Sequence, residues 1–187
     1  WSGNNGANQK FKFVQVIEGS KTIEDGTYTI SSGLDISKVI DVAQHNAISG
    51  ANVELYENSD FSSQIWNVEY LNNGYYALTS FSNSSLSLDV YGAYAIHGTN
   101  VQLYNHHGGE SQQWLIKEAG DGYYNIVSKL DHMYLDVAGG VSTNGTNIEI
   151  FQSNDGANQK FKFNKVDFAT LEDGLYTINS ALDENMV

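Results

Sequence analysis

Apolar and polar side chains alternate with a period of two over short stretches along the chain. Examples are YTI at 28–30, VIDV at 39–42, VELY at 53–56 and WNV at 66–68. This alternation is typical of strands with one buried face, and Tyr, Val, Ile and Phe favour such strands. Asp-Gly and Asn-Gly pairs between the stretches supply the positive φ of tight turns. No long helical stripe occurs, so the pattern predicts an all-β protein.

The alternating stretches recur in three units. The phrases DGTYTI, NGYYAL and DGYYNI begin at positions 25, 73 and 121, each 48 residues after the last. Each is followed by IDV or LDV, then by VELY, VQLY or IEIF, and finally by SQIW, SQQW or NQKF. Such repetition divides the chain into four-stranded units at 25–72, 73–120 and 121–168.

Three equal units of four strands predict a closed barrel with pseudo-threefold symmetry, capped by hairpins. Closure removes the unpaired edges that an open sheet would leave. A propeller is a rival architecture, but three blades are too few, and a solenoid is a weaker rival.

Charge restricts the possible partners. Nine lysines and no arginine face 22 acidic residues, giving a formal charge of −13. Nucleic-acid binding requires basic surface and is therefore excluded, and anionic membranes or heparin-like chains are disfavoured. No apolar run approaches the roughly 20 residues of a membrane span. A neutral ligand remains compatible with this composition.

The three motifs, repeated in register, resemble those of the ricin-type β-trefoil lectins and the related family 13 carbohydrate-binding modules. The second unit is nearest the family pattern, with LDV at 88–90 and VQLYNHHGGESQQW at 101–114. The resemblance covers essentially the whole chain. It implies a β-trefoil of three four-stranded repeats of about 48 residues, and a non-catalytic sugar-binding role.

Sugar recognition requires a group that accepts hydrogen bonds from vicinal hydroxyls and a flat ring that covers the C–H face of the pyranose. Each unit has an aspartate in its second strand and an aromatic residue 15 positions later. By resemblance, a polar residue of the following turn and the polar pair before the last strand complete each site. The predicted site residues are Asp41, Tyr56, Asn58, Ser63 and Gln64 in the first unit, Asp89, Tyr104, His107, Ser111 and Gln112 in the second, and Asp136, Phe151, Asn154, Asn158 and Gln159 in the third.

The sites depart from the family pattern to different degrees. Ser63 and Ser111 replace the usual asparagine, and the third unit uses Phe151 as its platform. We rank the second site first, the third next and the first last.

Each of these residue types also has a purely structural interpretation. The glutamines could satisfy buried backbone groups, the aspartates could hold turns, and the tyrosines could cap the barrel. The aromatic residues that close the units are expected to fill the barrel; they are Trp66, Trp114, Phe161 and Phe163.

Metal and catalytic sites receive little support. His106 and His107 are adjacent, and neighbouring side chains of an extended segment point apart. The acidic loops lack the spacing of a calcium site, and no G-x-S-x-G elbow occurs. Equivalent aspartates in separate units would lie too far apart for glycoside hydrolysis. We expect no metal, no cofactor and no enzymatic activity.

A longer repeat bears on domain organisation. The phrase GANQKFKF occurs at 6–13 and again at 156–163. It predicts that 1–17 is the tail of a preceding trefoil, 18–168 a trefoil, and 169–187 the start of a following one. An alternative register would close any three consecutive units together.

The function expected by resemblance is glycan binding. The ligands would be galactose-type sugars or plant-wall oligosaccharides. The trefoils would belong to a larger secreted bacterial protein, would contact its neighbouring domains, and would bring it to these glycans. The first alternative is a structural or interaction trefoil that has lost its sugar sites. A protease inhibitor of trefoil shape is the weakest alternative, because no unit carries a long exposed loop.

Overall fold

Twelve strands in three consecutive groups of four form the part of the chain that the computed structural model describes, residues 21–130 and 132–168. The predictions for 1–17 and 169–187 lie outside these residues. The strands are β1 Gly26–Ser32, β2 Lys38–Val42, β3 Val53–Glu57 and β4 Ile65–Tyr70; β5 Tyr76–Ser80, β6 Leu86–Val90, β7 Thr99–Asn105 and β8 Trp114–Gly120; β9 Tyr123–Ser128, β10 Tyr134–Val137, β11 Thr146–Phe151 and β12 Phe161–Lys165. The predicted all-β architecture of three four-stranded units is confirmed.

Six of the strands close into an antiparallel barrel, in the order β1, β4, β5, β8, β9, β12 and back to β1. The closing pair joins the first and third units, with a register from Tyr28 opposite Lys165 to Ser32 opposite Phe161. The ring of strands therefore closes between β1 and β12.

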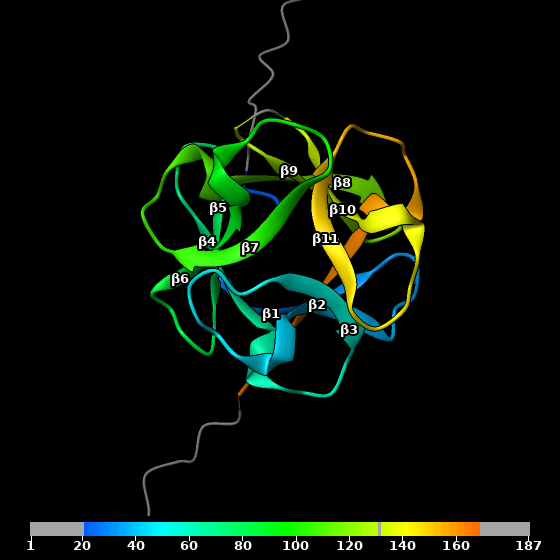
Figure 1. The fold of residues 1–187 in the computed structure, drawn as a ribbon, viewed down its shortest axis with the longest axis horizontal. Coiled ribbons are helices and arrows are strands. Elements are labelled where there is room, and N and C mark those ends of the chain that lie inside the picture. Colours follow the sequence, from blue (N-terminus) through cyan, green and yellow to red (C-terminus); the bar gives the residue numbers. More distant parts are fainter. Residues whose placement is uncertain (1–20, 131, 169–187) are drawn as a thin grey trace, which may run out of the picture.

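The other six strands form three hairpins, β2–β3, β6–β7 and β10–β11, one from each unit. Strand β11 also pairs with β3 and with β7, so the hairpins contact one another. Figure 1 shows the result as three lobes around a common centre, in blue to cyan, green, and yellow to orange.

Three asparagines at equivalent positions join the units where the hairpins meet. Asn52 Nδ2 donates to Asn147 Oδ1 at 3.0 Å, and Asn100 Nδ2 donates to Asn52 Oδ1 at 2.9 Å. Each unit contributes one member of this chain of amides.

The core fills the barrel and the underside of the hairpins. Trp66, Trp114 and Phe161 are at most 1% exposed, which confirms their predicted place. The indole Nε1 of Trp66 donates to Ile40 O and that of Trp114 to Leu88 O, each at 3.1 Å. Each tryptophan thus ties the barrel to the hairpin of its own unit.

Phe163 differs from this prediction because it is only partly buried. Its ring meets Tyr28 and Tyr124 edge-on, with centroids 5.9 and 5.8 Å away. The phenylalanine therefore packs beside the core cluster.

Short 3-10 turns connect the strands at two places in each unit. Those after the second strands are η2 Ala43–His45, η4 Tyr91–Ala93 and η6 Ala138–Gly140, and those before the last strands are η3 Ser62–Gln64, η5 Glu110–Gln112 and η7 Ala157–Gln159. In residues 21–130 and 132–168, no helical segment has the length and apolar character to cross a membrane.

Candidate functional site

The hairpin register brings the predicted aspartate and aromatic residue of each unit to one face. Asp89 lies directly opposite Gln102, as Asp136 lies opposite Glu149. Directly opposite residues of an antiparallel pair point the same way, and so do residues two apart on one strand. Tyr104 and Phe151, two residues beyond these partners, therefore share the face of the aspartates. We call the sites of the three units site 1 (Asp41, Tyr56), site 2 (Asp89, Tyr104) and site 3 (Asp136, Phe151).

The turn after each aspartate contains two consecutive residues in the left-handed region. Gly139 and Gly140 both have φ of 65° in the third unit, and Gly92 and Ala93 have 60° and 52° in the second. Glycine adopts this conformation without steric cost. These small residues line the hollows of sites 3 and 2.

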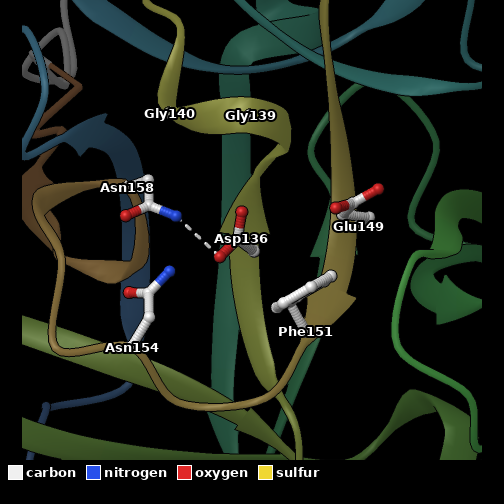
Figure 2. Close-up of a pocket in the computed structure, with 7 residues that line it drawn as sticks. All are labelled: Asp136, Gly139, Gly140, Glu149, Phe151, Asn154 and Asn158. Atoms are coloured by element: carbon white, nitrogen blue, oxygen red, sulfur yellow. Dashed lines mark hydrogen bonds between the residues drawn. The ribbon is translucent and has the colours of Figure 1, made fainter.

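Site 3 is a hollow of about 290 Å³. Asp136 lies between two asparagines on one side and Phe151 and Glu149 on the other (Figure 2). Its Oδ2 accepts hydrogen bonds from Asn158 Nδ2 and Gln159 Nε2, both at 2.7 Å. The lining residues are Asp136, Gly139, Gly140, Glu149, Phe151, Asn154 and Asn158.

Burial dominates the electrostatics of site 3. It raises the pKa of Asp136 above the ordinary value, although the hydrogen bonds from Gln159 and Asn158 act in the opposite direction. Burial, followed by the charge of Asp136, also raises the pKa of Glu149, and nearby His97 partly offsets this. Two acids therefore share this hollow.

Site 2 is larger, about 500 Å³, and has a glutamine in place of the second acid. Asp89 accepts from Gln102 Nε2 at Oδ1 and from Ser111 Oγ at Oδ2, both at 3.0 Å. Tyr104 is 42% exposed. The lining residues are Gly50, Asp89, Tyr91, Gly92, Ala93, Gln102, Tyr104, His107 and Ser111.

The imidazole of His107 is directed at Asp89. Its Nδ1 accepts from Gly109 N–H at 3.0 Å, which places the proton of the neutral ring on Nε2. That Nε2 lies 3.7 Å from Asp89 Oδ2, and the side chain is 48% exposed. His107 therefore presents a donor at the mouth of site 2.

The neighbouring His106 points elsewhere, because its Nδ1 lies 2.6 Å from Ser87 Oγ. The two histidines thus contact different side chains. Within the described residues, no group of three His, Asp or Glu side chains is placed to hold a metal ion.

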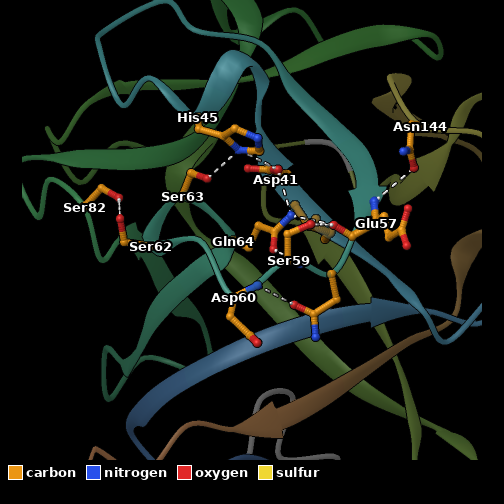
Figure 3. Close-up of polar contacts among 12 residues, drawn as sticks. Asp41, His45, Glu57, Ser59, Asp60, Ser62, Ser63, Gln64, Ser82 and Asn144 are labelled. Carbon is orange, nitrogen blue, oxygen red and sulfur yellow. Dashed lines mark hydrogen bonds and ion pairs between the residues drawn. The ribbon is translucent and has the colours of Figure 1, made fainter. Parts of the chain in front are cut away.

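Site 1 contains its aspartate and aromatic residue, but a side chain stands between them. His45 Nδ1 lies 3.1 Å from Asp41 Oδ2 and 3.0 Å from Ser63 Oγ (Figure 3). The ring of His45 also meets that of Tyr56 edge-on. Gln44 and His45 have φ of 58° and 54°, so the turn has the backbone of the other two sites.

The predicted glutamines Gln64, Gln112 and Gln159 are fully buried, as the structural interpretation of these residues expects. In each, Oε1 accepts a backbone N–H of the turn that precedes the glutamine, and Nε2 donates to a backbone oxygen. Gln64 and Gln159 also donate to Asp41 and Asp136. All three glutamines thus hold the turn, and Gln64 and Gln159 also hold the aspartate of their unit.

Asn58 is not at the position equivalent to His107 and Asn154. Equivalent residues are those whose N–H donates to the glutamine, namely Ser59, His107 and Asn154. Asn58 is one position earlier and accepts from Asp60 N–H at 3.4 Å. Ser59 therefore occupies the position assigned to Asn58.

Sequence reasoning also missed residues that line the hollows, including Tyr91, Gly139 and Gly140. A signal was available, because glycine follows the aspartate by three positions in the second and third units, while the first has Gln44 and His45 instead.

Comparison with known families agrees with this architecture. The family profile described as ricin-type beta-trefoil lectin domain-like matches residues 7–104 and 62–151, which together exceed half of the chain. Comparison with curated protein sequences gave no match.

Three solved structures illustrate the similarity. A designed threefold-symmetric protein, ThreeFoil, is 33% identical, with a TM-score of 0.73 over 76% of this chain and 100% of that one. An exo-beta-1,3-galactanase from Clostridium thermocellum is 26% identical, with a TM-score of 0.72 over 75% of this chain. A mosquitocidal holotoxin is 25% identical, with a TM-score of 0.71 over 87% of this chain. The match spans only 30% of the galactanase and 20% of the holotoxin.

The repeat motifs, the closed barrel with its three hairpins and the profile match lead to one assignment. The chain belongs to the ricin-type β-trefoil lectin-domain-like family.

Proposed function

We propose that this protein is a non-catalytic module that binds galactose-type or related glycans through sites 2 and 3. One observation carries the proposal: in two units an aspartate faces an accessible aromatic ring across an open hollow. Family membership supports carbohydrate binding in general. The similar β-1,3-galactanase, whose name states its substrate, supports the choice of galactose-type sugars.

Asp89 suits the recognition of two neighbouring hydroxyls. Each carboxylate oxygen accepts one protein hydrogen bond, from Gln102 or from Ser111, and retains a second acceptor direction. Two sugar hydroxyls can donate to these directions, each bond contributing about 1.5–3 kcal/mol before desolvation. The protein bonds hold the carboxylate in one orientation, so little ordering remains to be done on binding.

Tyr104 and His107 complete site 2. The tyrosine ring offers a flat apolar surface for the C–H face of a pyranose, with its hydroxyl left toward water. His107 Nε2–H, beside Asp89, is placed to donate to a ring or hydroxyl oxygen. Tyr91 and Tyr104 both line this larger hollow, which supports binding of more than one sugar ring.

Site 3 uses the same scheme with different groups. Phe151 replaces the tyrosine platform, and its apolar ring has no hydroxyl. Asn154 Oδ1 accepts from Gly156 N–H at 2.7 Å, which leaves the amide nitrogen for a ligand oxygen. The smaller hollow supports a single terminal sugar.

Each site is shallow and should bind alone with roughly millimolar affinity, about 4 kcal/mol. Two sites on one rigid barrel would gain from avidity on a surface that displays many glycans. We infer that the module targets a larger secreted protein to such surfaces. The matching regions of the holotoxin and the galactanase are parts of longer chains, which supports this inference.

The test compares the wild type with Asp89→Ala, Asp136→Ala and the double variant on a glycan array. We expect galactose-terminated glycans to bind the wild type, each single variant to bind more weakly, and the double variant not to bind. Circular dichroism and thermal unfolding check that the variants are folded. No binding of any glycan by a folded wild-type protein would favour the structural or interaction module instead.

A further inference from the structure

Site 1 has the same arrangement of aspartate, cross-strand partner and aromatic residue as the two open sites. Asp41 lies opposite Glu54 across the hairpin, as Asp136 lies opposite Glu149. Tyr56 follows two residues later on the same strand, as Tyr104 does in the second unit. Its residue types therefore combine those of sites 2 and 3.

The side chain of His45 lies against both the aspartate and the aromatic residue of site 1. Nδ1 lies 3.1 Å from Asp41 Oδ2, while the ring centroid is 5.7 Å from that of Tyr56 at 85° and 4.2 Å from that of Phe61 at 34°. Figure 3 shows the imidazole over Asp41 and Ser63. One face of the ring thus meets aromatic carbon while its nitrogen meets the carboxylate.

These are the two kinds of contact that a sugar would make in sites 2 and 3. The imidazole N–H of His45 takes the place of a sugar hydroxyl as hydrogen-bond donor. The carbon atoms of the imidazole take the place of the pyranose ring. Asp41 Oδ1 is fully buried and has no hydrogen-bond partner within the described residues. An acceptor for a second hydroxyl is therefore present in site 1 but unused.

The other units have small residues where His45 stands. The residue four positions after the aspartate is Ala93 in the second unit and Gly140 in the third. A Cβ built on Gly140 would meet no atom within 4 Å, so the space there is open. The backbone is alike at the three positions, with φ of 54°, 52° and 65°. The side chain at this position therefore differs between site 1 and the two open sites, as does Phe61, whose equivalents are Gly109 and Gly156.

We propose that His45 is an internal occupant that closes a third sugar site, so that its removal opens that site. The proposal rests on the proposed function of sites 2 and 3. It makes residue 45, and its equivalents Ala93 and Gly140, the determinants of how many sugars one chain binds.

The experiment is a titration of the isotope-labelled protein with lactose, followed by amide NMR shifts, because each site has its own reporters. In the wild type we expect lactose-dependent shifts at Gly92 for site 2 and at Gly140 for site 3, and none at Tyr56. His45→Gly should add a saturable shift at Tyr56 and leave the Gly92 response unchanged. His45→Ala is the second variant, because alanine already occupies the equivalent position 93.

The reverse substitution places a histidine in an open site and should abolish sugar binding there. Gly140→His should remove the lactose response of site 3, read at Phe151 because Gly140 is replaced, while Gly92 still responds. Histidine tolerates the left-handed backbone, as position 45 shows. Asp41→Ala combined with His45→Gly should abolish the new response at Tyr56.

The outcomes separate the two proposals. If Gly92 and Gly140 respond but Tyr56 stays silent in both folded His45 variants, the occupant role is overturned and the proposed function stands. A lactose response at Tyr56 in the wild type also overturns it, because site 1 would then be open. If neither the wild type nor the variants respond anywhere, the proposed function fails and this inference fails with it.

Discussion

Gln159 donates from Nε2 to Asp136 Oδ2 at 2.7 Å, from a side chain that no solvent reaches. The same amide donates to Gln152 O and accepts from Asn154 N–H. One buried residue therefore fixes the strand end, the turn and the carboxylate of site 3 together. The aspartate is held in place before any ligand arrives.

Replacing this glutamine should lower the stability of the fold. Gln159→Ala leaves buried donors and acceptors without partners, each costing about 1–3 kcal/mol, and we expect a loss of about 3 kcal/mol in the free energy of unfolding. Urea unfolding measures the change. The matched control is Gln152→Ala, whose exposed side chain should matter by less than about 0.5 kcal/mol. Equal effects of the two variants would contradict the framework role.

The asparagine chain between the units should be most sensitive at its middle member. Asn52 both donates to Asn147 and accepts from Asn100, so Asn52→Ala removes two hydrogen bonds. We expect it to cost about 2 kcal/mol, against about 1 kcal/mol for Asn100→Ala or Asn147→Ala. Thermal unfolding of the three variants side by side provides the ranking, and a larger loss at either end would refute it.

Tyr91 should matter only for ligands longer than one ring. It lines the large hollow of site 2, whereas its neighbour Tyr94 does not. We expect Tyr91→Ala to weaken lactose binding several-fold, about 1 kcal/mol, and to leave galactose binding nearly unchanged. Calorimetry in an Asp136→Ala background isolates site 2. Tyr94→Ala, also exposed, is the control and should have no effect.

Sugar binding at site 3 should fail at low pH. Burial raises the pKa of Asp136, and only the ionised carboxylate accepts two hydroxyl protons. In an Asp89→Ala variant, lactose binding should therefore be lost as the pH falls through this raised pKa, above the ordinary aspartate range. Affinity measured between pH 7 and 4 tests this, and binding that persists unchanged to pH 4 would refute it.

Glu149 should make a pH-dependent contribution to stability with a defined sign. Its pKa is raised in the folded state, chiefly by burial, so the folded protein holds this proton more tightly than the unfolded chain does. That contribution is present below the ordinary glutamate pKa and is lost as the pH rises through the raised value. Glu149→Gln should therefore be more stable than the wild type at neutral pH and similar to it in acid. Glu69→Gln, which replaces an exposed glutamate, is the control.

Much of the fold could be predicted because its signals are local. Period-two alternation and Asp-Gly or Asn-Gly turns act within a few residues, and the unit repeats every 48 residues. Asp89 and Tyr104 could be paired from their spacing alone, because the two strands of a hairpin place residues at that spacing on the same face. The structure therefore agrees with the sequence-based predictions for strands and turns, which depend on residues close together in the chain.

The sequence by itself determined the three repeats, the strands and the identity of the acid and ring in each unit. Only the tertiary structure decided which glutamine atoms bond to the turn, that Ser59 rather than Asn58 is equivalent to His107 and Asn154, and that Phe163 is only partly buried. It also decided that His45 turns back over Asp41, while Gly140 leaves the same space open. The physical reason is that these outcomes depend on the direction of a side chain relative to atoms distant in sequence, which an alternating pattern does not specify.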